Sequence, residues 1–128
     1  MTQNNIEKLV RVKLEEMFGT KLRKRRLIIG YDSQKRPQIH EFDLVSDDME
    51  IVGELKSGKR SITNYNLALV DCVYLSKIKA RTKLMIFTNK SLYEYFKERS
   101  GGLIGKDIRV IFIPLDVHLN PLISSYGI

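Results

Sequence analysis

The sequence has one cysteine, Cys72, and no hydrophobic run of the length that a membrane span requires, about 20 residues. A single cysteine excludes an internal disulfide and a zinc site built from several thiolates. Because Cys72 lies in an apolar stretch, we expect a buried thiol rather than a nucleophile. The start, MTQNNIEK, has no basic segment followed by an apolar one, so no secretory signal is expected. These absences favour a reducing, cytoplasmic setting.

Internal repeats, low-complexity tracts and linkers are also missing. The 128 residues fit one domain, 1–128, which is large enough to bury its own core. A hydrophobic fraction of 43% and a charged fraction of 29% are typical of ordinary globular proteins. The composition therefore predicts a single globular domain.

Acidic residues are outnumbered, because 22 Lys and Arg against 15 Asp and Glu give a formal net charge of +7. Five of the six residues in KLRKRR (21–26) are basic, and Lys77, Lys79, Arg81 and Lys83 form a second group. This balance favours a phosphate-rich partner such as nucleic acid, with a solvated basic face as the alternative. A membrane surface is disfavoured because neither group lies on a clear amphipathic helix with large apolar anchors.

Hydrophobic periodicity predicts an α/β chain with the element order α-β-β-β-α-β-α-β. An antiparallel meander that passes into parallel βαβ crossovers gives a mixed central sheet flanked by helices. Residues beyond 114 are left unassigned. The predicted helices cover 4–18, 62–78 and 91–99, and the predicted strands cover 25–31, 39–45, 49–56, 83–88 and 107–114.

Two of these strands lie in the segment EFDLVSDDMEIVGELKSGK (41–59), on either side of an acidic turn. Glu54 and Lys56 share one face of the second strand because alternate strand residues point the same way. Salt-bridged surface residues are the ordinary explanation for a Glu-x-Lys pattern. The alternative is a metal-dependent active site, which requires a second carboxylate on the same face.

Asp43 supplies that carboxylate if the turn has an even number of residues centred on the Asp-Asp dipeptide. In this register Asp43 faces Val52 and Glu41 faces Glu54, so Asp43 lies diagonal to Glu54. A slip of one residue would separate the two carboxylates. Paired carboxylates suit a hard cation, Mg²⁺ or Mn²⁺. A lysine beside the metal can orient water and stabilise charge on an attacked phosphate.

The pattern of Asp43, a short hairpin and Glu54-Leu55-Lys56 resembles the PD-(D/E)XK, or restriction-endonuclease-like, nuclease superfamily. HEFDLV followed by GELKSG is similar to the small Holliday-junction-resolvase-like and restriction-type members. The element order is similar to the αβββαβ common core over residues 4–88, with an added αβ unit after it. One departure is Phe42, which stands where a proline often precedes the aspartate.

This resemblance implies a Mg²⁺-dependent endonuclease that hydrolyses the phosphodiester bonds of DNA, which is favoured over RNA. It implies Asp43, Glu54 and the Leu55 carbonyl as metal ligands and Lys56 as the catalytic lysine. Glu41, two residues before the aspartate, would assist.

Family members often carry one further glutamate from the first helix, for which Glu7, Glu15 and Glu16 compete. At about 100° per residue, Glu7 falls between Leu14 and Phe18 in the apolar stripe, whereas the other two glutamates lie at or beyond its edge. A carboxylate in such a stripe costs stability unless it has a partner, so we expect Glu7 to join the site. A first-turn carboxylate stabilised by the helix dipole explains it equally well.

Basic and polar residues near these carboxylates are expected to contact the nucleic-acid backbone. A polar helix entry explains the later members of the set equally well. His40, expected on the face opposite Asp43, and His118 have no partner that suggests a triad. The expected nucleic-acid contacts are Lys24, Arg25, Arg26, Lys59, Arg60 and Asn64.

Two other interpretations stay open. One is a nuclease-fold module that binds nucleic acid or a protein partner without cutting, and the other is a basic structural domain whose hairpin charges only pair with each other. Sequence-specific cutting by a chain of this length would require a homodimer or a larger complex.

Overall fold

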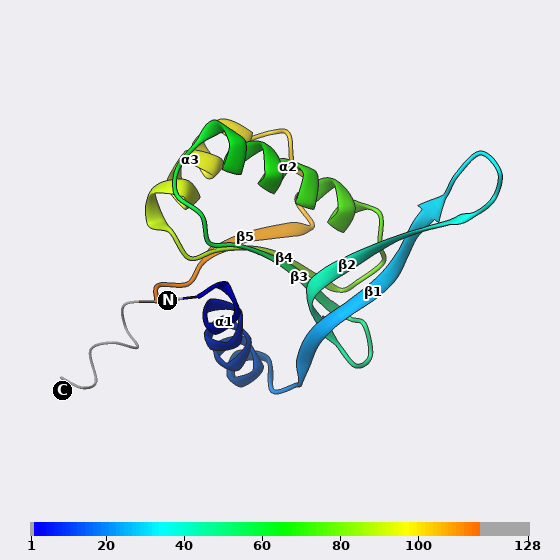
Figure 1. The fold of residues 1–128 in the computed structure, drawn as a ribbon, viewed down its shortest axis with the longest axis horizontal. Coiled ribbons are helices and arrows are strands. Elements are labelled where there is room, and N and C mark those ends of the chain that lie inside the picture. Colours follow the sequence, from blue (N-terminus) through cyan, green and yellow to red (C-terminus); the bar gives the residue numbers. More distant parts are fainter. Residues whose placement is uncertain (1, 116–128) are drawn as a thin grey trace.

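The computed structural model describes residues 2–115, which form a mixed five-stranded sheet with helices on both faces (Figure 1). The strand order is β1-β2-β3-β4-β5; the first three strands are antiparallel, and β4 and β5 continue in parallel. The predicted element order and α/β class are confirmed. The elements are α1 (Gln3–Phe18), β1 (Leu22–Tyr31), β2 (Pro37–Ser46), β3 (Ile51–Lys56), α2 (Ile62–Ser76), β4 (Thr82–Phe87), α3 (Lys90–Ser100) and β5 (Ile108–Phe112).

The sheet has a hydrophobic core on each face. Helix α1 covers one face, and α2 and α3 cover the other (Figure 1). All six residues of β4 are buried, which is why this strand shows no polar alternation in the sequence. Toward α1 the core contains Val10, Leu14, Leu44, Leu55 and Ile86; toward α2 and α3 it contains Phe42, Val45, Val52, Phe87 and Phe96.

Local sequence signals explain where the helices begin and end. The Ser61 hydroxyl accepts a hydrogen bond from the Asn64 amide and begins α2, and Asn89 does the same for Leu92 in α3. Gly19 ends α1 in the left-handed conformation, with φ of 66°. Cys72 of α2 is buried as predicted, and this burial raises the pKa of its thiol to about 12. No helix in residues 2–115 is long and apolar enough to cross a membrane.

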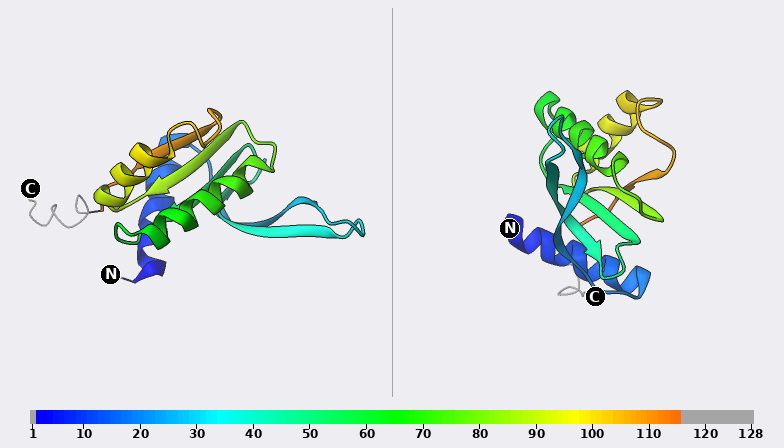
Figure 2. Two further views of the ribbon diagram at one scale, coloured as in Figure 1. Left: turned by 90° about the horizontal axis from the view of Figure 1, so that it is seen from above. Right: turned by 90° about the vertical axis from the view of Figure 1, so that its right-hand side faces the viewer.

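Strands β1 and β2 extend beyond the body of the protein as a twisted two-stranded arm, residues 26–41 (Figure 1 and Figure 2). Its tip turns through Asp32, whose carboxylate accepts hydrogen bonds from the Gln34 and Arg36 amides. Ile28 and Ile39 pair across the strands and are each more than half exposed. The arm therefore carries basic and apolar side chains away from the core.

The register of the β2–β3 hairpin differs by two residues from the predicted one. A shift of two keeps the side-chain parity, and Asp43 then lies level with Glu54 rather than diagonal to it. The observed pairs are Leu44 with Gly53 and Val45 with Val52, so the predicted pairs of Asp43 with Val52 and of Glu41 with Glu54 are wrong.

The turn between these strands explains the shift. The Ser46 hydroxyl accepts a hydrogen bond from the Ile51 amide and donates one to Asp48. Asp48 also accepts from the Glu50 amide, and Met49 adopts a left-handed conformation with φ of 61°. The loop therefore closes around Asp48 and Met49, one position later than the Asp-Asp dipeptide.

A β-bulge interrupts the pairing of β1 with β2. Strand β1 has only Lys24 opposite two residues of β2, Asp43 and Leu44. As a result, Phe42 and Val45 both pack toward α2 and α3 although they are three residues apart. The bulge places Asp43 at the point where regular side-chain alternation breaks.

Candidate active site

Four carboxylates from four different elements influence one another electrostatically beside the bulge. They are Glu7 of α1, Asp43 of β2, Glu54 of β3 and Asp71 of α2, called the carboxylate cluster below. Burial raises the pKa of both Asp43 and Glu54 most; the charges of Glu7 and Asp71 raise that of Asp43 further, and those of Asp71 and Asp43 raise that of Glu54 further. The structure therefore places Asp43, Glu54 and Glu7 within electrostatic range and adds Asp71, which the sequence analysis missed.

Side-chain hydrogen bonds hold Asp43 and Glu54 where the β2–β3 backbone ladder ends. The Asp43 amide donates to Glu54 Oε1 at 3.2 Å, and the Leu55 amide donates to Asp43 Oδ2 at 2.8 Å. Each carboxylate thus occupies a position that a backbone carbonyl takes in a continuous ladder. These two hydrogen bonds fix both side chains without using all of their oxygen lone pairs.

Lys56 follows on the same strand and forms an ion pair with Asp71, with Nζ 2.8 Å from Oδ2. Asp71 was missed because it lies 15 positions further along the chain, in a helix that is apolar on most sides. That apolar setting was itself a signal, since a carboxylate among buried residues needs a partner. The same reasoning had selected Glu7.

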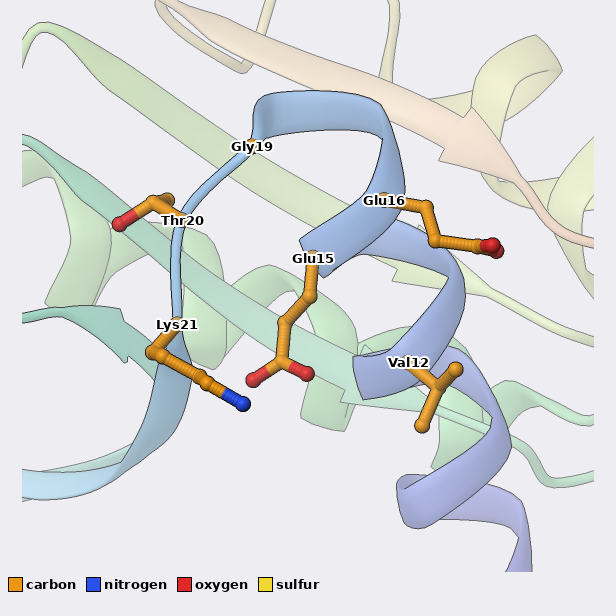
Figure 3. A pocket seen from close by; sticks show the side chains of 6 residues that line it. All are labelled: Val12, Glu15, Glu16, Gly19, Thr20 and Lys21. Atoms are coloured by element: carbon orange, nitrogen blue, oxygen red, sulfur yellow. The ribbon is translucent and has the colours of Figure 1, made fainter.

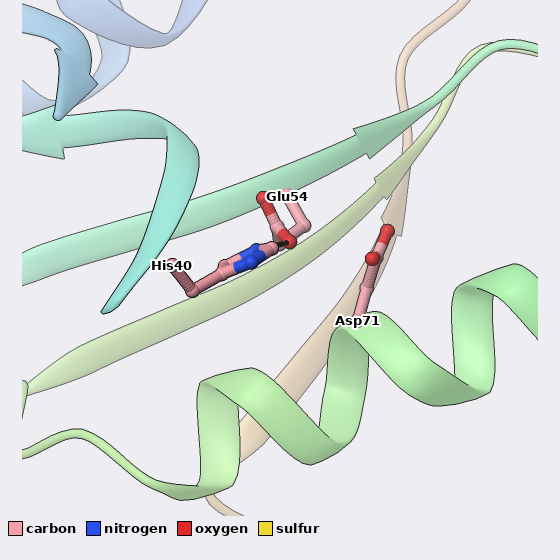
Figure 4. A group of neighbouring side chains, drawn as sticks. All are labelled: His40, Glu54 and Asp71. Atoms are coloured by element: carbon pink, nitrogen blue, oxygen red, sulfur yellow. Dashed lines mark hydrogen bonds and ion pairs between the residues drawn. The ribbon is translucent and has the colours of Figure 1, made fainter. Parts of the chain in front are cut away.

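His40 also belongs to this site, so its predicted position on the far face without a partner is wrong. Its Nε2 lies 2.8 Å from Glu54 Oε2 (Figure 4). The imidazole stacks on Tyr74 with a centroid separation of 3.9 Å and meets Phe42 edge-on at 4.7 Å. His40 reaches Glu54 because Phe42, two residues later, packs toward α2. His118 lies outside the described residues.

Glu7 is held by neighbours at the start of α1. Lys24 Nζ lies 3.1 Å from its carboxylate, and this hydrogen bond raises the pKa of Lys24. Gln3 donates to Glu7 at 3.4 Å and accepts a 2.6 Å hydrogen bond from Ser57, just after β3. The first turn of α1 is therefore tied to the strand that carries Glu54.

The competing glutamates of α1 lie elsewhere. Glu15 accepts a hydrogen bond from the Leu22 amide at 2.9 Å and is thereby engaged in joining α1 to β1. Both Glu15 and Glu16 line a shallow pocket of about 360 Å³ at the end of the helix (Figure 3). No member of the carboxylate cluster lines this pocket. Glu7 is the glutamate of α1 whose charge acts on Asp43, and its role in the site stays a prediction.

Negative charge exceeds positive charge in the cluster. Lys24 pairs with Glu7 and Lys56 pairs with Asp71, whereas no Lys or Arg within residues 2–115 forms an ion pair with Asp43 or Glu54. Burial, followed by the charges of Asp71 and Asp43, raises the pKa of Glu54 to about 9. Burial is also the main cause of the raised pKa of Asp43, opposed by the Leu55 amide and Lys56. A cation between the two carboxylates would relieve this repulsion.

Comparison with protein-family models, curated proteins and solved structures returned no match. The geometry and charge of the carboxylate cluster are therefore the basis for assigning a function.

The residues expected to contact nucleic acid differ in their exposure and in their partners. Arg26 is exposed on β1 opposite Glu41, which is also exposed, and Arg25 is half-buried. Arg60 lies over the Tyr95 ring, 4.5 Å from its centroid. The Asn64 side chain donates to the Lys59 carbonyl at 2.8 Å, so it stabilises the loop after β3. This contact supports the polar-helix-entry interpretation of Asn64.

One residue of the second basic group is not on the surface. Lys83 is buried in β4, and its Nζ lies 3.0 Å from Asp107. β4 lies between β3 and β5 and is covered on both sides within the sheet, which explains this burial. The predicted basic group therefore loses Lys83.

Proposed function

We propose that this protein is a Mg²⁺- or Mn²⁺-dependent nuclease that hydrolyses the phosphodiester bonds of DNA. The observation that carries the proposal is the meeting of Asp43, Glu54 and Lys56 in a cluster with excess negative charge. The order α1-β1-β2-β3-α2-β4 supports a restriction-endonuclease-like core, to which α3 and β5 add a further unit.

The donor set of the site fits a hard cation. Asp43 and Glu54 supply carboxylate oxygens, and the Leu55 carbonyl lies between Glu54 and Lys56 in the chain; oxygen ligands are those that Mg²⁺ and Mn²⁺ prefer. When bound, such an ion polarises the phosphate and lowers the pKa of a coordinated water. Glu7, held by Lys24, lies close enough to Asp43 to raise its pKa and so completes the acidic side of the site.

Lys56 has the role of stabilising charge on the attacked phosphate. Its ammonium is half-buried, where electrostatic interactions are stronger than in bulk water. Asp71 positions this ammonium through the 2.8 Å ion pair, so it reaches the phosphate without losing much side-chain entropy. We infer that Asp71 is a positioning residue rather than a ligand of the reacting phosphate.

The arm, together with residues 23–25 that lead into it, supports DNA as the partner. Residues 23–41 contain six Lys and Arg residues and two acidic residues, so they carry more than half of the net charge of +7. A two-stranded β-ribbon fits the major groove of B-DNA, which is about 12 Å wide. The arm begins next to the bulge, where Lys24 lies opposite Asp43, so DNA held along it would approach the carboxylate cluster.

Cleavage assays on supercoiled plasmid, linear duplex and single-stranded DNA test the proposal. The wild-type protein should cut with Mg²⁺ or Mn²⁺ and not with a chelator. Glu54→Gln should lower the rate by about 100-fold or more, because it removes a metal ligand while keeping the side-chain shape. The control Glu94→Gln changes an exposed carboxylate on α3 and should cut at the wild-type rate. Equal rates for Glu54→Gln and wild type would exclude the proposed active site.

A second candidate function is binding of nucleic acid without cleavage. The ion pair between Lys56 and Asp71 favours it, since it leaves the ammonium already engaged. Calorimetry separates the two functions. Binding without cleavage would be supported if the wild-type protein binds DNA in a salt-dependent way, has no Mn²⁺ affinity and cuts none of the substrates.

Charge on the arm should control the affinity for DNA. Replacing Lys35 and Arg36 at the arm's tip with glutamine should lower the slope of log K against log salt by about 1 to 2, because each phosphate contact releases a counterion. Lys106→Gln, an exposed change in the loop before β5, is the matched control and should leave the slope unaltered. Fluorescence anisotropy over a salt series measures this slope, and identical slopes for both variants would place the DNA elsewhere.

A further inference from the structure

A histidine lies among the carboxylates on the side that faces α2. His40 is the only histidine in residues 2–115, and single ligand atoms from His40, Glu54 and Asp71 all lie within 4.8 Å of one another (Figure 4). These residues come from β2, β3 and α2, so the tertiary fold rather than a local motif assembles them. The group mixes nitrogen and oxygen donors, unlike the Asp43–Glu54 pair.

The imidazole is held in place by helix α2. Tyr74 stacks on His40 with an interplanar angle of 21°, and Phe42 meets it at 85°. Tyr74 follows Asp71 by three positions, so both side chains lie on one face of the helix. Helix α2 thus supplies one candidate ligand and orients another. Restriction of the ring lowers the entropy cost of binding an ion.

The charges of the three residues also favour a cation. Glu54 is only 3% exposed, and His40 Nε2 lies 2.8 Å from its Oε2. Asp71 is buried as well and uses one oxygen for Lys56, which leaves its second oxygen for another contact. Buried carboxylates in such numbers are normally paired or bind metal ions.

We propose that His40, Glu54 and Asp71 bind a transition-metal ion such as Zn²⁺ or Co²⁺ in preference to Mg²⁺. Imidazole is a good ligand for these ions, whereas Mg²⁺ favours oxygen donors alone. Ligands at about 2.0–2.2 Å from one tetrahedral ion lie about 3.4 Å apart. A bound ion would replace the 2.8 Å contact of His40 Nε2 with Glu54 and would compete with Lys56 for the Asp71 carboxylate.

One consequence rests on the proposed nuclease function. Glu54 belongs both to this site and to the Asp43–Glu54 pair, so an ion beside His40 competes for a ligand of the catalytic cation. It also competes with Lys56 for Asp71. Zn²⁺ should therefore inhibit Mg²⁺-supported cleavage.

Titration of the full chain with Co²⁺, followed by visible absorption, and with Zn²⁺, followed by calorimetry, tests the site without an activity assay. The wild-type protein should bind one ion per chain with the absorption bands of a coordinated Co²⁺. His40→Gln should weaken binding by about 100-fold or more, because it removes the nitrogen ligand. Glu94→Gln should bind like wild type. Absence of Co²⁺ binding to the wild type, or equal binding to His40→Gln, would overturn the proposal.

Two further measurements keep the test decisive. The ring of His40 packs on Tyr74, so His40→Gln can unfold; in that case Asp71→Asn is the test variant. It should show the same loss of metal affinity, and unchanged metal binding to Asp71→Asn would overturn the site. In a variant that binds Zn²⁺ more weakly, Zn²⁺ should inhibit cleavage less. The ratio of the cleavage rate with Zn²⁺ to the rate without it should therefore rise toward one. Co²⁺ binding that depends on His40 in a protein that never cuts would leave this site standing and reject the nuclease function.

Discussion

Lys56→Met is expected to reduce divalent-dependent DNA cleavage by about 10²- to 10⁴-fold. Lys56 carries the one ammonium group of β3, two residues after Glu54 on the same face, and methionine keeps its length without its charge. Binding of DNA should fall far less, because residues 23–41, which include the arm, contain six Lys and Arg residues, whereas Lys56 is a single cation. Single-turnover rates at saturating protein separate the two effects.

A double variant distinguishes chemistry from folding. Lys56→Met alone leaves Asp71 without its ion-pair partner, so it should also destabilise the fold. Lys56→Met combined with Asp71→Asn removes both charges and should recover most of the lost stability while cleavage stays lost. Lys90→Met, an exposed change at the start of α3, controls for loss of a lysine. Recovery of cleavage in the double variant would show that Lys56 acts only by pairing with Asp71.

Glu54→Gln is expected to stabilise the metal-free protein at alkaline pH. The pKa of Glu54 is raised to about 9 by burial and by Asp71 and Asp43, so the folded state binds more protons than the unfolded state between the ordinary carboxyl pKa and that value. The free energy of unfolding therefore falls as pH rises through this window, by up to about 1.4 kcal/mol per pH unit. Glutamine does not ionise and removes this contribution.

Urea unfolding in a chelator at several pH values measures the effect. Near the upper end of the window the variant should exceed the wild type by on the order of 3 kcal/mol, and the difference should shrink as the pH approaches the ordinary carboxyl pKa. Mn²⁺ should restore wild-type stability at alkaline pH, because a bound cation stabilises the ionised carboxylate, and should do less for the variant. Parallel pH profiles for wild type and Glu54→Gln would contradict the assignment of a buried, protonated Glu54.

Several features of the fold and site were predictable because their causes are local. The caps at Ser61 and Asn89 and the glycine at position 19 mark helix ends through hydrogen bonds or dihedral angles within a few residues. Apolar periodicity separated the helices from the strands. Glu7 was identified because a carboxylate within an apolar helix stripe needs a partner, which the structure supplies as Lys24.

The register of the hairpin was predictable only in its parity. The turn closes through the side chains of Ser46 and Asp48, and a left-handed Met49 completes it, so the pairing moves by two residues. Side-chain parity survives such a shift, which is why Asp43 and Glu54 still meet. Parity did not predict the hydrogen bonds that hold these two carboxylates, because those bonds form where the backbone ladder of β2 and β3 ends.

Other features depend on contacts between distant segments. The bulge opposite Lys24 reflects the pairing of β1 with β2 and brings His40 to Glu54, although simple alternation from Asp43 assigns it to the other face. Asp71 joins the site because α2 packs across the sheet. Lys83 is buried because β4 is an interior strand of that sheet.

By itself, the sequence determined the element order, the helix ends, the shared face of Glu54 and Lys56 and the charge that favours a phosphate-rich partner, because each follows from spacing or composition along the chain. Only the tertiary structure decided that Asp71 joins the carboxylate cluster and that His40 lies beside Glu54 and Asp71, because strand pairing and helix packing bring together residues that no local pattern connects.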